Sequence, residues 1–229
     1  MTKAEGWLES DGVRLAWKRT GGAGPTLLWL GGFQSEMVGT KAEALAAWAE
    51  ARGRDFLRFD YFGHGDSGGA FADGTITRWR ADALAVLDRL TEGRVVLAGS
   101  SMGGWLACLA ATARPDRVGA LLLIAPAPDF TQRLTEGYRF TRSLLEDGAR
   151  WSILAGPIPI EAPVRIVHGG EDTDAPWPRA LELAMAIKGP DVVFSLVRDG
   201  GHRLSRPQDL ERIIAFAEEL TLAGRRTAG

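Results

Sequence analysis

Ser101 is a candidate nucleophile because it lies at the centre of the sequence Gly99-Ser100-Ser101-Met102-Gly103. The apolar run VVLA precedes this sequence and a helical pattern follows it, so the serine falls on a turn from strand to helix. Such a turn strains the backbone of its central residue and exposes the hydroxyl. The next backbone N–H, from Met102, would lie at the helix N-terminus, where a developing oxyanion is stabilised. The alternative is a glycine-rich connection with helix-capping serines, which suits Ser100 better than Ser101.

A serine nucleophile needs a base, and the chain has three histidines: His64, His168 and His202. For this serine motif the order along the chain is serine, acid, histidine. Only His168 and His202 follow Ser101, and an acid between nucleophile and base requires His202. The sequence VRDGGHRLS places His202 in a glycine-rich loop after the last expected strand. His168 ends the preceding strand, so we interpret it as a structural residue that hydrogen-bonds the loop after it.

The acid that orients the base is expected in the sequence HGGEDTDAP. Asp172 lies there just after a strand, in a turn, and is the favoured residue. Glu171 and Asp174 are its rivals in the same loop, where they otherwise read as solvated charges. Asp129 follows the preceding strand in APAPDF and is a further alternative.

A second oxyanion donor is expected from the loop after the strand TLLWLGG. Gly31 and Gly32 allow the backbone to approach the nucleophile closely. The N–H of Phe33 is therefore the predicted donor, with that of Gln34 as the alternative. A tight turn that needs positive φ angles would use the same glycines and is compatible with this role.

The elements that would position these residues alternate between strands and helices. Expected strands cover residues 13–19, 26–32, 55–63, 95–100, 118–127, 164–170 and 191–197, and expected helices cover 38–52, 76–91, 102–114, 177–189 and 207–224. This alternation predicts an α/β fold with a mostly parallel, doubly wound sheet, as one domain over residues 1–229. Residues 128–162 interrupt the alternation, and we expect a short inserted lid there.

Composition excludes several classes of protein. A formal net charge of −2 over 229 residues gives no basic footprint for nucleic acid. The single cysteine, Cys108, allows neither an intramolecular disulfide nor a cysteine-based metal site, and its apolar neighbours predict a core position. No apolar run approaches the roughly 18 residues that span a membrane, and the first residues lack the apolar segment of a signal peptide. We therefore expect a soluble, cytoplasmic protein.

Five segments of the chain resemble the α/β-hydrolases: LGGFQSEMVGTKA, RFDYFGHGDSGG, GSSMGGW, HGGEDTDAPW and DGGHRLSRPQDL. They extend from residue 30 to 210. The first and last further resemble a branch whose animal members are mitochondrial acyl-glucuronide esterases, also described as palmitoyl-protein thioesterases. The resemblance implies the α/β-hydrolase fold, with Ser101 as nucleophile, Asp172 as acid and His202 as base. Met102 and Phe33 would form the oxyanion hole.

The implied reaction is hydrolysis of a carboxylic ester or thioester through an acyl-enzyme, without metal or organic cofactor. The substrate would be a small acyl compound or an acylated protein. Animal relatives carry an N-terminal targeting segment, whereas this chain begins almost at its first expected strand, which favours a bacterial cytoplasmic setting. The segment 128–162 is shorter than the family's lid, which would leave the acyl pocket more open.

Several apolar side chains are candidates to line an acyl site, although each except Phe33 fits core packing better: Phe33, Trp105, Tyr138, Phe140, Leu144, Trp151 and Trp177. Arg203 follows the expected base and would meet an anionic leaving group or form a surface ion pair. The same fold and triad also support carbon–carbon hydrolysis or perhydrolysis, and a non-catalytic ligand receptor is a further alternative.

Overall fold

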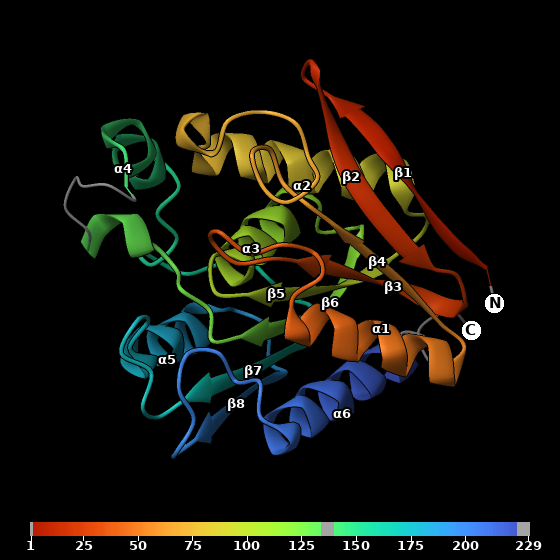
Figure 1. Cartoon of the computed structure of the whole chain (residues 1–229). Helices are drawn as coiled ribbons and strands as arrows, with labels where there is room; N and C mark the ends of the chain where they lie inside the picture. The colour runs from red at the N-terminus through yellow and green to blue at the C-terminus, as the bar shows by residue number, and fades with distance from the viewer. Residues whose placement is uncertain (1, 134–139, 224–229) are drawn as a thin grey trace.

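The computed structural model describes residues 2–133 and 140–223, and its strands form one sheet (Figure 1). Eight strands belong to this sheet within the described residues. Their bounds are β1 Lys3–Ser10, β2 Val13–Thr20, β3 Ala23–Leu30, β4 Arg54–Phe59, β5 Val95–Ser100, β6 Val118–Ile124, β7 Val164–Gly169 and β8 Val192–Val197. The strand order is β1-β2-β4-β3-β5-β6-β7-β8. β1, β2 and β4 pair antiparallel, and every pairing from β4 to β8 is parallel. The mostly parallel α/β sheet predicted from the sequence is therefore confirmed.

The N-terminal strand β1 is an element that the sequence did not predict. It pairs with β2 over its whole length, from Lys3 opposite Thr20 to Ser10 opposite Val13. Only Leu8 and Ser10 of this strand are buried. Its apolar alternation is therefore too weak to identify, and backbone pairing with β2 holds it in place.

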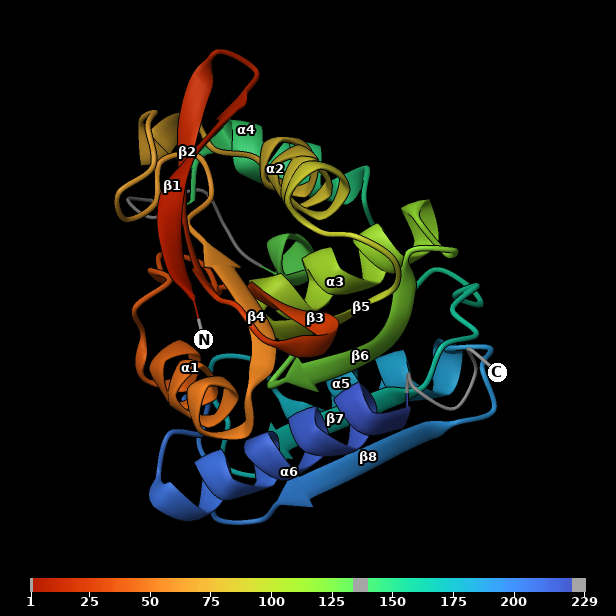
Figure 2. The same ribbon diagram turned by 90° about the vertical axis from the view of Figure 1, so that its right-hand side faces the viewer.

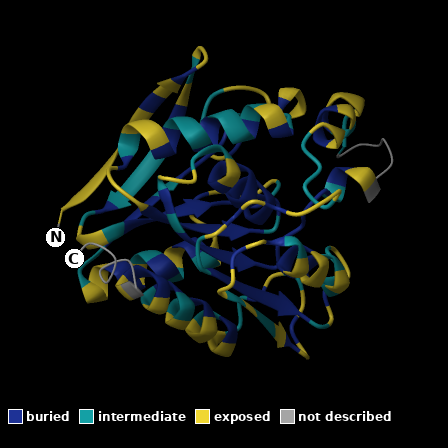
Figure 3. Ribbon diagram, turned by 180° about the vertical axis from the view of Figure 1, so that it is seen from behind, coloured by how far each residue is buried: buried dark blue, intermediate teal, exposed yellow. Residues whose placement is uncertain are grey.

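Helices cover both faces of the sheet, as the alternation predicted (Figures 1 and 2). Their bounds are α1 Thr40–Arg52, α2 Ile76–Leu90, α3 Met102–Ala113, α4 Arg142–Ala149, α5 Trp177–Ala186 and α6 Pro207–Ala223. One apolar cluster joins the sheet to α2, α3 and α5, and a second joins it to α1 and α6. Figure 3 shows the central strands as the most deeply buried part of the chain. Burial on both faces explains why these strands read as continuous apolar runs.

The segment between β6 and β7 departs from the strand–helix alternation, as expected for the predicted lid. Its described part contains a short 3-10 helix, Phe130–Arg133, and α4. The Thr141 hydroxyl caps α4 by accepting a hydrogen bond from the Leu144 N–H. α4 packs against α2 and the 3-10 helix, so the segment stands over one end of the sheet (Figure 1).

Helix α3 packs against the sheet at unusually short range, which requires glycine at Gly103. A Cβ atom built there would lie 2.0 Å from the Leu30 carbonyl oxygen and 2.5 Å from that of Gly31. Both contacts are to backbone atoms, which cannot move aside without displacing the end of β3. Gly99 is equally restricted, because its Cβ would lie 2.3 Å from the Gly103 carbonyl oxygen. These two glycines let α3 begin directly beside the ends of β3 and β5.

We expect Gly103→Ala to lower the free energy of unfolding by about 1–3 kcal/mol, because overpacking outweighs the better helix propensity of alanine. Urea denaturation followed by circular dichroism measures this change. Gly156→Ala is the matched control, since a Cβ at Gly156 meets no atom within 4 Å. Equal effects of the two substitutions would contradict the packing argument.

Candidate active site

Ser101 occupies a strained turn between β5 and α3. Its φ of 55° and ψ of −118° are unfavourable for a residue with a side chain. The turn is held by backbone hydrogen bonds from the Ser101 N–H to the Ile124 carbonyl (2.9 Å) and from the Gly104 N–H to the Ser101 carbonyl (2.9 Å). The Ser101 side chain makes no capping hydrogen bond to α3. Helix capping therefore does not explain why a serine occupies this turn. The turn instead presents the serine to the cavity beside it.

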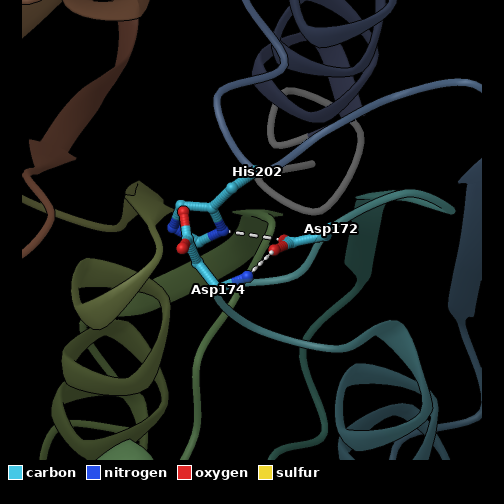
Figure 4. Close-up of side chains that lie close together, drawn as sticks. All are labelled: Asp172, Asp174 and His202. Carbon is cyan, nitrogen blue, oxygen red and sulfur yellow. Dashed lines mark hydrogen bonds and ion pairs between the residues drawn. The ribbon is translucent and has the colours of Figure 1, made fainter.

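The three predicted triad residues come together at the carboxyl ends of β5, β7 and β8. His202 Nε2 lies 3.0 Å from Ser101 Oγ, and His202 Nδ1 lies 2.7 Å from Asp172 Oδ2 (Figure 4 shows the second contact). An ionised carboxylate only accepts hydrogen bonds, so Nδ1 carries the proton. Nε2 then offers its lone pair to the serine hydroxyl. This arrangement can remove the serine proton and stabilise the resulting imidazolium.

Asp172 is a buried carboxylate with hydrogen-bond donors on both oxygens. Oδ1 accepts from the N–H groups of Asp174 (3.0 Å) and Ala175 (2.8 Å). Oδ2 faces His202 and also His168 Nε2, at 3.1 Å. Burial opposes ionisation, but the hydrogen bonds from His168, His202 and Ala175 outweigh it and hold the pKa of Asp172 well below its usual range. The contacts around Asp172 therefore favour its ionised form.

His168 contacts the acid loop, as the sequence predicted for a structural histidine. The side chain is fully buried, and Nε2 lies 2.7 Å from the Ala175 carbonyl oxygen as well as near Asp172. Both partners are acceptors, so Nε2 carries a proton that the two oxygens share. The histidine thus fixes the loop that carries the acid.

The loops that carry acid and base are joined by their backbones. The Glu171 N–H donates to the Gly200 carbonyl (2.8 Å), and the Gly170 N–H donates to the Val197 carbonyl (2.7 Å). On the other side of His202, Lys41 Nζ on α1 donates to the Arg203 carbonyl at 2.5 Å. The backbone around the base is consequently held from two directions.

The rival acids lie in other environments. Asp129 is buried, and its carboxylate accepts hydrogen bonds from Ser152, Ile153 and Leu154, so it orders the segment after α4. Glu171 is exposed, and its backbone N–H donates to the Gly200 carbonyl. Asp174 is also exposed, although its carboxylate lies beside the His202 ring (Figure 4).

The loop after β3 approaches the nucleophile closely. A Cβ built on Gly32 would lie 3.4 Å from Ser101 Cβ, which shows how closely this loop approaches the serine. The Gln34 N–H donates to His64 Nε2 at 3.3 Å and is therefore engaged. Among the described hydrogen bonds outside regular elements, neither Phe33 nor Met102 uses its N–H as a donor. Of the two predicted alternatives in this loop, the geometry favours Phe33.

A cavity of about 600 Å³ opens at the nucleophile, within the usual range of ligand sites. Apolar residues from three segments line it together with polar residues of the acid loop and α5: Phe33, Met102, Pro126, Ala127, Pro128, Phe130, Phe140, Thr173, Asp174 and Arg179. Ser101 and His202 line the same cavity. An acyl compound seated there would present its carbonyl to the serine.

Only two of the predicted lining residues, Phe33 and Phe140, reach this cavity within the described part of the chain. Trp105 and Leu144 are core residues, and Trp151 packs beside the core with its ring N–H bonded to Thr77. Trp177 begins α5 and is not among the lining residues of the cavity. Tyr138 lies outside the described residues.

The environments of Cys108, Arg203 and Arg179 complete the comparison with the sequence-based predictions. Cys108 is fully buried, and burial raises the pKa of its thiol to about 12, so it is a core residue as predicted. The Arg203 side chain is exposed, while Arg179 lines the cavity instead. Sequence reasoning missed Phe130, Thr173 and Arg179, because their approach to Ser101 depends on how the segment 128–162 and the acid loop fold back.

Asp172, Asp174 and His202 also offer ligand atoms that lie within 4.8 Å of one another (Figure 4). Such a trio can in principle hold a metal ion. However, His202 Nδ1 donates its proton to Asp172 Oδ2 at 2.7 Å, and the lone pair of Nε2 faces Ser101 Oγ at 3.0 Å. The arrangement fits proton transfer better than metal binding.

Comparison with known proteins shows the family of this chain. Residues 27–157 match the Hydrolase_4 family, described as serine aminopeptidase, S33. Palmitoyl-protein thioesterase ABHD10, mitochondrial, from Mus musculus is 37% identical over 92% of this chain and 80% of that protein. The chain belongs to the α/β-hydrolases. It is an ester or thioester hydrolase, as the resemblance implied.

Two solved structures are similar over nearly the whole α/β-hydrolase chain. The mouse alpha/beta hydrolase domain-containing protein 10 has a TM-score of 0.90 and 35% identity, covering 95% of this chain and 98% of that one. A putative hydrolase from Agrobacterium vitis S4 has a TM-score of 0.90 and 38% identity, covering 96% of this chain and 100% of that one. The α/β-hydrolase fold predicted from the motifs is confirmed.

The predicted cytoplasmic location is contradicted, because the related palmitoyl-protein thioesterases from mouse, rat and human are named as mitochondrial proteins. That prediction depended on where the chain begins, and the position of a first residue does not report a compartment. Within the described residues, none of the helices has the length and apolarity required to cross a membrane.

We expect Asp172→Asn to lower kcat by on the order of 10⁴, because an amide favours the wrong tautomer of His202. Steady-state hydrolysis of a nitrophenyl ester measures it. Asp174→Asn is the matched control: its carboxylate also lies beside His202, but only its backbone N–H contacts the acid. A loss below tenfold for Asp172→Asn, or an equal loss for both, would move the acid elsewhere.

Proposed function

We propose that this hydrolase forms an acyl-enzyme on Ser101, with His202 as general base and acid and Asp172 as the residue that orients it. The observation that supports this most is the continuous hydrogen-bonded line from Asp172 Oδ2 to His202 (2.7 Å) and from His202 to Ser101 Oγ (3.0 Å). Nucleophile and base at this separation need no rearrangement before reaction.

In the first half of the proposed reaction, His202 Nε2 takes the Ser101 proton as Oγ attacks the ester or thioester carbonyl carbon. Negative charge moves to the carbonyl oxygen, where the N–H groups of Phe33 and Met102 would receive it. The tetrahedral intermediate collapses, and His202 passes its proton to the departing alcohol or thiol. Water then repeats the sequence on the acyl-enzyme and releases the carboxylic acid.

We further propose an acyl substrate with an apolar chain, either a small ester or thioester or an acyl group carried on a protein. The rings of Phe33, Phe130 and Phe140 supply an apolar wall to the cavity. Phe33 and Phe140 stack with centroids 5.3 Å apart. The mouse relative is named a palmitoyl-protein thioesterase, and a thioester of an apolar acyl chain belongs to the substrate class proposed here.

The segment 128–162 would serve as the lid of a single hydrolase domain. Phe130 and Phe140 reach the cavity from it. Among the described residues, Phe33 is the other aromatic side chain that lines the cavity, apart from the His202 ring. The lid would therefore set acyl-chain preference, while the triad sets the chemistry.

Labelling with a fluorophosphonate tests the nucleophile directly, because the reagent reacts only with an activated serine. We expect peptide mass mapping to place the label on Ser101, and Ser101→Ala to lose both label and esterase activity. Ser100→Ala is the matched control: Ser100 is the adjacent hydroxyl but is buried at the end of β5. Labelling of folded Ser101→Ala at the same rate as wild type would overturn the assignment.

Phe140→Ala tests the acyl wall. We expect KM for an octanoyl thioester to rise about tenfold, since an aromatic contact contributes roughly 0.5–1.5 kcal/mol beyond area burial. KM for the acetyl analogue should change less than twofold. Trp7→Ala, which removes a ring that is 51% exposed on β1, is the control. Equal rises for both chain lengths would place the acyl chain elsewhere.

A further inference from the structure

His64 is a buried histidine that the proposed triad does not use. It lies in the segment RFDYFGHGDSGG, in the loop after β4, and is 4% exposed. The rings of Tyr61, Phe71 and Trp79 surround it edge-on, with centroids 5.7, 5.1 and 5.3 Å away. Most buried polar atoms have hydrogen-bond partners, so the contacts of the two ring nitrogens show how this imidazole is held.

Both nitrogens of His64 have partners, and these define its tautomer. Nδ1 lies 3.1 Å from the Phe62 carbonyl oxygen, which only accepts, so Nδ1 carries the proton. Nε2 lies 3.3 Å from the Gln34 N–H, which only donates, so Nε2 presents its lone pair. The ring is thus neutral, and burial lowers its pKa, which keeps it neutral.

The partner of Nε2 is the residue next to the proposed oxyanion donor. Gln34 has a φ of 56°, a strained value for a residue with a side chain. The loop after β4 holds the same loop at a second point, where Asp60 Oδ1 accepts from the Met37 N–H at 2.7 Å. The backbone on the far side of Phe33 is therefore anchored by His64 and Asp60.

We propose that His64 is a positioning residue of the oxyanion hole: by accepting the Gln34 N–H, it holds the strained loop so that the Phe33 N–H stays free and directed at the substrate oxygen. This inference rests on the proposed function. It adds a residue of the loop after β4 to a site otherwise built from β3, β5, β7 and β8.

A role in positioning the oxyanion donor has a specific kinetic consequence. The N–H of Phe33 would bind the oxygen more strongly as negative charge develops on it. Loosening the loop should consequently lower kcat by about 10- to 100-fold, as small misplacements do, with little change in KM. If His64 only stabilised the fold, its substitution would instead lower the fraction of enzyme molecules that are folded and active.

The test compares His64→Leu with His64→Gln. Leucine removes the acceptor, whereas glutamine places a carbonyl oxygen near the position of Nε2. Each variant is assayed on a nitrophenyl ester and on its thionoester, whose C=S sulfur accepts hydrogen bonds more weakly than oxygen. The rate ratio between the two substrates reports the oxyanion contacts, and it is independent of how much enzyme is folded.

We expect His64→Leu to lower the ester-to-thionoester ratio at least about fivefold and His64→Gln to keep it within about twofold. His168→Gln is the matched control, because that buried histidine contacts the acid and should slow both substrates equally. An unchanged ratio in His64→Leu, or an equal drop in both His64 variants, would overturn the inference. Fluorophosphonate labelling of Ser101 in the same preparations tests the proposed function separately.

Discussion

The site depends on burying the negative charge of Asp172. A buried carboxylate is tolerated only where donors replace the water that it loses, and four surround this one: two backbone amides and two histidines. Satisfying it fixes the acid loop through Ala175 and orients His202 through Nδ1. The backbone bonds between residues 170–171 and 197–200 then carry this order to the neighbouring strand end. One desolvated charge thereby organises two loops.

The strained serine turn is the second constraint, and glycine makes it possible. Ser101 has its unfavourable φ because α3 begins directly beside β3 and β5. The neighbouring backbone there leaves no room for a Cβ atom at Gly99 or Gly103. The same close approach brings the backbone of Gly32 against Ser101. Nucleophile and oxyanion loop are thus positioned by one packing contact, so a change that relaxes it would misplace both.

Much of this could be predicted from residue patterns. Buried parallel strands give continuous apolar runs, so β3 and β5 to β7 could be inferred, and the order of residues along the chain predicted that Asp172 and His202 lie together near Ser101. β1 could not, because only two of its residues are buried. The choice between Phe33 and Gln34 stayed open because it depends on His64, which is 30 positions away and meets the loop only in the folded chain.

The three histidines of the chain differ in what their Nε2 atoms meet. His202 is partly exposed and faces the serine hydroxyl, so its Nε2 can exchange a proton. His168 is fully buried against two oxygens and is held as a donor. His64 is buried between a carbonyl and an amide, and is therefore held as a neutral bridge. The Nε2 atoms of His168 and His64 are thus committed to fixed partners, whereas Nε2 of His202 faces a hydroxyl that can give up its proton.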